Sequence, residues 1–516
     1  MDDASWQQYK DAKEQWVGNH TGGPLVRILA VCGACLTGYA TWMLVLRPLR
    51  LAGMRALLAD FATLVLPLLL ACTQFAYHLV PLHLSLAALV LAEYSRRTHP
   101  LTNAAKRGRT SLQKFADALN GIDTDIQSEQ RSSEPTPKAC FTPGSDTATP
   151  RGSECTSFDE HSFAYAQDAI HDAIAEESDV DDVVASLSVP QTSPLHSPDT
   201  DDTPRANQRE FPEYSTPNET RRVLTVFRAN LMILTVVCIL AVDFAVFPRE
   251  FAKCETWGMS LMDLGVGAFV FSHGIVSVRV RRPIRERLTR IARRMFPLLV
   301  LGAVRVAMVK GTAYPEHVSE YGVHWNFFFT QAALLPVTEL VQLLVPQSSL
   351  GVLGVLIAVA HQVVLTTTPL EAWAVSTHRT PQSLISLNKE GITSVPGYVA
   401  IALLGVDTGA ALRAVPPVPL MPLCKRALVW WSLLLVCHGA SIETSRRLAN
   451  LPYVLLTAAF SISFLLGLLC IARWTAARPG APGMAPRAPR LLALVNRHGL
   501  AVFLAVGGGC AATCRY

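Results

Sequence analysis

Apolar blocks long enough to cross a lipid bilayer recur along most of this chain. A transmembrane helix needs about 20 apolar residues, because the hydrocarbon core is about 30 Å thick. Half of the 516 residues are hydrophobic and only 16% are charged. The pattern predicts an all-α, polytopic membrane protein with about twelve or thirteen transmembrane helices. The expected spans are residues 24–46, 57–74, 76–91, 224–246, 259–278, 295–309, 325–345, 350–368, 395–412, 428–442, 452–472 and 491–513.

The basic residues between these blocks predict the orientation of the chain. Residues 282–294 contain a dense run of arginines, and such loops stay on the cytosolic side. This choice places the N-terminal tail, with its candidate glycosylation residue Asn19, in the lumen together with residues 310–323. The first span lacks a basic n-region and a cleavage site, so we expect it to remain as an anchor. Arg446 and Arg447 oppose the scheme, because they fall in a loop that it places in the lumen.

Residues 96–222 differ in composition from everything around them. Serine, threonine, proline and acidic residues dominate, and too few apolar residues are present to offset the chain entropy lost on folding. The segment is therefore expected to be a disordered cytosolic loop. The predicted organisation is a lumenal tail (1–23), a three-helix membrane segment (24–95), this loop (96–222) and the main helix bundle (223–516).

Two residues near the end of the span 224–246 are candidates for catalysis. Asp243 follows a long stretch without charge, and an acid at that depth is costly to ionise without a partner. Lys253 lies ten residues further along the chain. An acid beside a lysine can act as a general base on a sugar hydroxyl, while the lysine stabilises the developing oxyanion. The alternative is a helix-end ion pair that only fixes packing.

Asp263 is the next acid within an apolar span, and it has glycines beside it that permit close helix contact. One interpretation is an acceptor for sugar hydroxyls. The other is an acid whose hydrogen bonds are satisfied by a neighbouring helix. Asn388, Lys389 and Glu390 form a polar cluster before the next long span, either facing the same site or forming a solvated loop.

The segment KGTAYPEHVSEYGVHWNFFF, residues 310–329, concentrates ionisable and aromatic side chains between two apolar spans. A helix after Pro315 would place its acids and an imidazole on one face. The spacing is not HExxH, so a polar floor for a head group is preferred to a metal site. Arg305 and Lys310 either pair with a substrate phosphodiester or extend toward the membrane surface. The other candidates are Glu316, His317, Glu320, His324, Trp325 and Asn326.

Three strings of this sequence resemble the GPI inositol acyltransferase family. They are ILAVDFAVFPREFAKCETWGMSLMDLGVGAFVFS (239–272), the segment 310–329, and SLNKEGITSVPGYVAIALLG (386–405). The resemblance covers most of the chain outside residues 96–222, although the C-terminal AVGGGCAATCRY departs from the longer last helix of the family. It implies transfer of a long-chain acyl group, typically palmitoyl, from acyl-CoA to the inositol of glucosaminyl-phosphatidylinositol in the endoplasmic reticulum membrane.

Several further expectations follow from the residues. The chain has no serine nucleophile elbow, Gly-rich phosphate loop or cysteine in an evidently polar setting, so we expect direct acyl transfer without a covalent acyl-enzyme. No permanently bound cofactor and no nucleic-acid partner are expected. The alternative functions are a lipid transporter or flippase, in which the intramembrane acids would carry ions or protons, and a non-catalytic scaffold of GPI assembly.

The predicted orientation can be tested by cysteine accessibility. In sealed, right-side-out microsomes, a Ser319→Cys variant should resist an impermeant thiol reagent, because residue 319 faces the lumen. A Ser277→Cys variant, beside the arginine-rich loop, should react. Labelling of Ser319→Cys under these conditions would move the polar segment to the cytosolic face.

Overall fold

The structure is a computed structural model that describes residues 18, 20–49, 51–98, 217–277, 283–311, 318–414, 418–476 and 488–513. These residues form helices and connecting turns, with no β-strand among them. Eight of the described helical segments are long and apolar enough to cross a membrane, and two shorter apolar helices accompany them. The predicted all-α, polytopic membrane fold is confirmed.

The long helices follow the expected apolar blocks, and each expected span overlaps a helix, although the helix in the span 224–246 ends at Ala241. Short non-α turns, η1 (Trp42–Leu46) and η3 (Phe61–Val65), extend or join the first helices, and η4 (Arg249–Phe251) lies between α9 and α10. The α-helices are α2 (Leu25–Thr41), α3 (Gly53–Asp60), α4 (Leu66–Cys72), α5 (Leu79–Thr98), α9 (Pro217–Ala241), α10 (Leu261–Val276), α11 (Ile284–Gly311), α12 (Val318–Tyr321), α13 (Phe327–Leu344), α14 (Leu350–Thr367), α15 (Leu370–Val375), α16 (Leu384–Leu387), α17 (Lys389–Ala414), α18 (Leu420–Gly439), α19 (Leu451–Ala476), α20 (Arg490–Arg497) and α21 (Gly499–Thr513).

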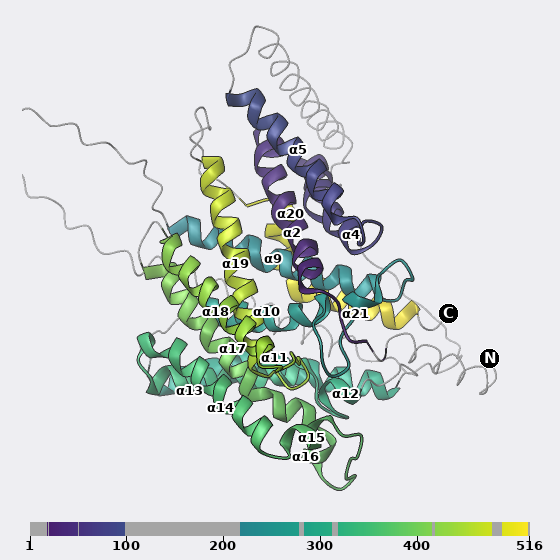
Figure 1. Ribbon diagram of the computed structural model, residues 1–516, viewed down its shortest axis with the longest axis vertical. Helices are drawn as coiled ribbons and strands as arrows, with labels where there is room; N and C mark the ends of the chain where they lie inside the picture. Colours follow the sequence, from purple (N-terminus) through teal and green to yellow (C-terminus); the bar gives the residue numbers. More distant parts are fainter. Residues whose placement is uncertain are drawn as a thin grey trace, which may run out of the picture.

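Helices α17 and α19 form the centre of the bundle. Helix α17 packs against α10 and α14, and α19 packs against α18, while α2 and α5 pair on the N-terminal side (Figure 1). Small residues allow the close approach of α10 and α17. A Cβ atom at Gly405 would lie 2.3 Å from the carbonyl oxygen of Phe271, and one at Gly274 would lie 2.2 Å from that of Ala402. This is the small-residue packing expected between membrane helices.

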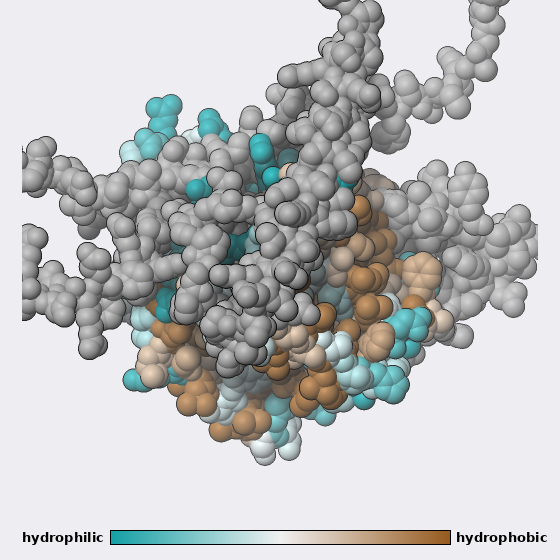
Figure 2. Space-filling model, turned by 90° about the horizontal axis from the view of Figure 1, so that it is seen from above, coloured by the Kyte–Doolittle hydropathy of each residue, from teal (hydrophilic) through white to brown (hydrophobic). Residues whose placement is uncertain are grey.

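The outer helices α13, α14 and α18 expose large apolar side chains, such as Leu344, Leu356 and Leu435. In the space-filling view, apolar side chains form broad patches over the part of the visible face that is not grey (Figure 2). An apolar surface of this kind is appropriate where the solvent is lipid rather than water.

Two groups of helix ends define the two ends of the bundle. We call the end at which α2, α10, α13, α17 and α19 begin the polar end, because the buried charged residues described below gather there. At the opposite end, α9 begins and α19 ends. Arg473 on α19 donates to both carboxylate oxygens of Glu219 on α9, at 2.9 and 3.0 Å, and also to the carbonyl of Val418.

Helices extend into both ends of the expected loop 96–222, and the expected last span consists of two helices instead of one. Helix α5 runs to Thr98 and α9 begins at Pro217, so both margins of the predicted loop are helical. The remainder of that loop lies outside the described residues. The predicted span 491–513 consists of α20 and α21, separated at His498, and Phe503 on α21 contacts Phe328 with ring centroids 6.2 Å apart.

Deleting residues 127–215 should therefore leave the bundle intact, because the deletion stops short of α9 and preserves the Glu219–Arg473 pair. We expect membrane insertion, thermal unfolding temperature and the acyl-transfer activity that the resemblance implies to match those of the full chain. A lower unfolding temperature, measured in detergent, would show that the deleted segment packs against the bundle.

Candidate active site

Five charged side chains are almost completely buried at the polar end of the bundle. Asp263, Lys389, Glu390, Arg446 and Arg447 each expose 6% or less of the residue. Isolated charges are very costly in such surroundings, so each must be paired or hydrogen-bonded. The partners of these five residues determine how the loops at this end are held.

Asp263 stands in the first turn of α10, where Ser260 caps the helix by accepting from the Asp263 backbone N–H at 3.1 Å. One carboxylate oxygen of Asp263 accepts from the Ser260 hydroxyl at 2.7 Å and from the Cys254 N–H at 2.9 Å. The other oxygen accepts from Nε of Arg446 at 2.5 Å. An acid in the first helical turn is also favoured by the helix dipole. With three donors on its two oxygens, Asp263 positions Arg446 rather than awaiting a substrate hydroxyl.

Three tyrosines surround this ion pair. The guanidinium carbon of Arg446 lies 5.6 Å from the ring centroid of Tyr321, a cation–π distance. Tyr398 and Tyr453 pack edge to face at 6.4 Å, and the Tyr453 hydroxyl donates to the backbone carbonyl of Asp263 at 2.8 Å. Burial raises the pKa of the Tyr321 hydroxyl above its ordinary value. Tyr321 therefore stays neutral and supplies a ring face rather than a negative charge.

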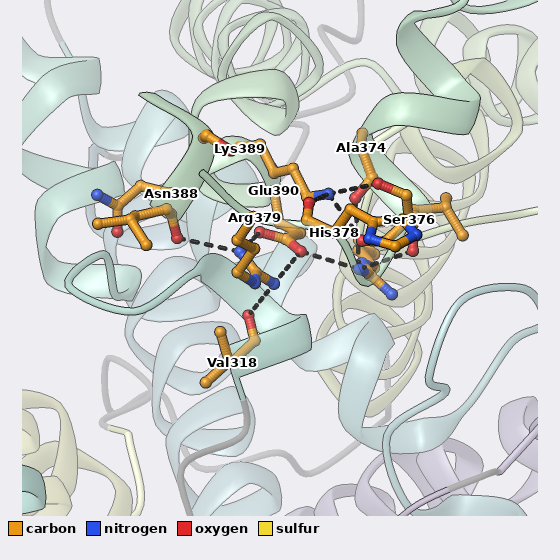
Figure 3. A network of polar contacts seen from close by, with 12 residues as sticks. Val318, Ala374, Ser376, His378, Arg379, Asn388, Lys389 and Glu390 are labelled. Atoms are coloured by element: carbon orange, nitrogen blue, oxygen red, sulfur yellow. Dashed lines mark hydrogen bonds and ion pairs between the residues drawn. The ribbon is translucent and has the colours of Figure 1, made fainter. Parts of the chain in front are cut away.

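Glu390, at the start of α17, joins two arginines from different loops (Figure 3). Arg379 donates to both Glu390 oxygens, at 2.5 and 3.0 Å, and Arg447 donates to one of them at 2.9 Å. Arg379 also reaches the backbone carbonyls of Leu387 and Val318. A buried carboxylate shared by two arginines fixes three segments of the chain relative to one another.

Lys389 is completely buried beside Glu390. Its ammonium lies 2.7 Å from both the backbone carbonyl and the hydroxyl of Ser376, 2.7 Å from the Trp373 carbonyl and 3.0 Å from the His378 carbonyl (Figure 3). These acceptors use all three ammonium donors. Lys389 therefore holds the loop after α15 against α17.

Asn388 holds the polar segment before α13 in place. Its side-chain oxygen accepts from the backbone N–H groups of His324 and Trp325, at 2.8 and 2.9 Å. Asn326 caps α13 and donates to the backbone carbonyl of Gly302 on α11 at 2.9 Å. Of the polar side chains in this segment that were expected to form the floor of a head-group site, Asn326 thus binds backbone groups, and Trp325 donates to the Thr330 hydroxyl at 2.9 Å.

The proposed pairing of Asp243 with Lys253 is not found among the described residues. Helix α9 ends at Ala241, and Asp243 is exposed in the following turn, so the expectation of a buried acid is wrong. Phe247 and Phe251 occupy the interior of that connection instead. The ammonium of Lys253 lies 2.7 Å from Glu320 Oε1. Asp243 and Lys253 nevertheless both stand on the connection between α9 and α10, at the polar end.

The remaining predicted site residues are either exposed or outside the described part of the chain. Arg305 is exposed on α11, where it is free to extend toward the membrane surface. No group of three or more histidine, cysteine or acidic residues within the described ranges has a metal-binding arrangement. The residues Asn19, Glu316 and His317, and the side chain of Lys310, lie outside the described part of the chain.

Sequence reasoning missed the arginines of the site, although it noted a signal for two of them. Arg446 and Arg447 conflicted with the expected orientation because that rule concerns basic residues in exposed loops. Here they are buried and paired with Asp263 and Glu390. Arg379 gave no comparable signal, since it lies in an otherwise ordinary polar loop, eleven residues before its partner Glu390 on α17.

Replacing Glu390 with glutamine should lower the free energy of unfolding by about 3–5 kcal/mol, because Arg379 and Arg447 would remain buried without their carboxylate. The measurement is thermal or denaturant unfolding of the purified protein in detergent. Glu443→Gln is the matched control, since Glu443 is exposed in the loop before α19. Equal stability of the two variants would contradict the structural role of Glu390.

Comparisons with known proteins agree on one family. The GWT1 family model matches residues 9–133 and 181–506. A relative named GPI-anchored wall transfer protein 1, from Cryptococcus neoformans var. neoformans serotype D, is 33% identical over 96% of this chain and 92% of its own length. Proteins of the same name from Aspergillus fumigatus and Gibberella zeae are 42% and 44% identical over 54% and 55% of this chain.

These last two alignments span 63% and 65% of the relatives' own lengths, whereas the Cryptococcus alignment spans nearly all of both proteins. The family match includes α9, α10, α17, α19 and the loops that carry the polar end. The resemblance inferred from the sequence strings is confirmed. The chain belongs to the GWT1 family, the GPI inositol acyltransferase family associated with GPI-anchor biosynthesis.

Proposed function

We propose that this protein transfers a long-chain acyl group, typically palmitoyl, from acyl-CoA to an inositol hydroxyl of glucosaminyl-phosphatidylinositol. The observation that carries this proposal is the family match, which runs through every element of the polar end. Both substrates are amphiphilic, so they need a site with apolar walls and a polar end. Helices α10, α17 and α19 combine these two properties in one bundle.

The reaction forms one ester bond and breaks one thioester bond. The inositol hydroxyl oxygen attacks the thioester carbonyl carbon, negative charge develops on the carbonyl oxygen, and the carbon–sulfur bond then breaks. The proton removed from the hydroxyl finally resides on the thiol of free CoA. The protein must supply a base for that proton and a donor for the oxyanion.

Asp243 and Lys253 are our candidates for these two tasks. Asp243 is exposed, so its carboxylate is available to a substrate hydroxyl that arrives at the polar end. Lys253 is held by Glu320, and this one contact leaves further ammonium donors for a carbonyl oxygen. Glu320 thus holds the ammonium in place, while Asp243 accepts the proton from the acceptor hydroxyl.

Direct transfer, without an acyl-cysteine, is the route that we propose. One cysteine, Cys254, does lie in a polar setting that the sequence did not reveal, since its backbone N–H donates to Asp263. Burial, followed by the nearby charge of Asp263, raises the pKa of the Cys254 thiol above its ordinary value. A thiol that keeps its proton is a poor nucleophile.

We further propose that the polar end faces the lumen of the endoplasmic reticulum, with the N-terminal tail on the same side. The arginine-rich start of α11 belongs to the opposite end, because Arg287 near its beginning approaches Glu339 near the end of α13 at 3.6 Å. Acyl-CoA is the co-substrate, and no permanently bound cofactor is required. The acyl group must then cross from cytosolic CoA to an acceptor at the other leaflet.

Asp243→Asn and Lys253→Ala should each abolish inositol acylation while expression and membrane insertion stay near normal. Each change removes charge from a partly or fully exposed position without disturbing apolar packing. The measurement is acylation of a glucosaminyl-phosphatidylinositol analogue by purified protein. Lys425→Ala is the control, because Lys425 is exposed on α18 near the opposite end. Full activity in either candidate variant would reject the proposed pair.

The same assay separates the alternative functions. Acyl-CoA-dependent ester formation by the purified wild-type protein would exclude a lipid transporter or flippase as the primary activity. A folded protein that binds both substrates without forming the ester would favour a non-catalytic scaffold of GPI assembly.

A further inference from the structure

Arg446 is the one arginine of the polar end whose terminal nitrogens have no hydrogen-bond acceptor in the described structure, although its side chain is only 3% exposed. Its Nε donates to Asp263, and its plane faces the ring of Tyr321. The two terminal nitrogens carry four N–H donors between them. Neither nitrogen is among the fully enclosed side-chain atoms that lack a partner, so both reach space that an incoming acceptor can enter.

The charges around Arg446 indicate that this acceptor is negative. Among the residues that the structure describes, the network that joins Arg446 to its neighbours holds five cations and three carboxylates, and an excess of buried positive charge is costly without a counter-anion. Its cations are Lys253, Arg379, Lys389, Arg446 and Arg447, and its carboxylates are Asp263, Glu320 and Glu390. The Nε of Arg447 is also buried without a partner.

Exposure increases from Arg446 toward the outside. The carboxylate of Glu320 interacts electrostatically with the guanidinium of Arg446, and the Glu320 side chain is 16% exposed. The side chain of Lys253, the ion-pair partner of Glu320, is 35% exposed. The more exposed Lys253–Glu320 pair therefore marks the side from which an anion would approach Arg446. A guanidinium donates two parallel hydrogen bonds to phosphate oxygens, which makes arginine well suited to a phosphodiester.

We propose that Arg446, held by Asp263 and Tyr321, binds the phosphodiester of the inositol phospholipid behind the Lys253–Glu320 pair. The inference rests on the proposed function and adds a specificity residue to it. The phosphodiester is attached directly to the inositol ring, so binding it at Arg446 brings the ring hydroxyls close to Lys253. Asp263 is a positioning residue, since it acts on the substrate through Arg446.

The test compares soluble fragments of the lipid. Glycerophosphoinositol should raise the thermal unfolding temperature of the purified full-length protein in detergent. Free inositol, which lacks phosphate, and inorganic phosphate, which lacks the ring, should have little effect at the same concentration. An equal shift with inorganic phosphate would overturn the assignment to the lipid headgroup.

A charge-balanced double variant, Asp263→Asn with Arg446→Gln, removes the anion site without leaving either partner charged and buried. It should lose the response to glycerophosphoinositol, and its KM for the phospholipid should rise at least tenfold while its KM for acyl-CoA is unchanged. Glu219→Gln with Arg473→Gln neutralises an ion pair at the opposite end and should keep the response. An undiminished response in the first double variant would overturn the proposal.

Arg446→Lys provides a second test if the double variant is unstable. Lysine retains the pairing with Asp263 but has no planar fork, so at least tenfold more glycerophosphoinositol should be needed for the same shift. An unchanged concentration dependence would reject the site. An Arg446-dependent response in a wild-type protein that forms no ester would reject the proposed reaction and support the site. Ester formation with an unchanged phospholipid KM in the variants would support the reaction and reject the site.

Discussion

The pairing of buried charges at one end of the bundle is the constraint on which the rest of the structure depends. Asp263 and Glu390 each stand in the first turn of a central helix, and each binds an arginine from the loop that precedes α19. Two adjacent residues, Arg446 and Arg447, therefore connect α10 and α17 to the start of α19. Because an unpaired buried charge costs several kcal/mol, separating any of these three helix ends from the others is unfavourable.

In the reaction that we propose, this arrangement assigns positioning and chemistry to different side chains of the polar end. Lys389 and Asn388 form their hydrogen bonds with backbone groups, and these bonds hold the surrounding loops. Neither side chain is needed for contact with a substrate. Lys253 and Asp243 are more exposed and lie on the connection between α9 and α10. A rigid frame that carries a few accessible ionisable groups is the arrangement that preorganised catalysis requires.

The helices could be predicted from the sequence, whereas the partners of the site residues could not. Apolar block length is a local property, and it located the helical spans. The Asp263–Arg446 pair joins residues 183 positions apart, and no local pattern encodes such a contact. The prediction that Asp243 is buried was wrong for a related reason. The apolar run 244–247 continued the helical pattern past Ala241, but the chain turns there so that Phe247 can be buried. The polar segment 310–329 was identified by composition, yet the role of Asn326 as a helix cap depends on where α13 begins.

The Glu219–Arg473 pair has a practical meaning for protein engineering. It ties the first turn of α9 to the last turns of α19 and so closes the bundle just after the long segment that joins α5 to α9. Because this pair holds the start of α9 to the end of α19, residues 99–216 are a suitable position for inserting a fluorescent protein or a fiducial domain for electron microscopy.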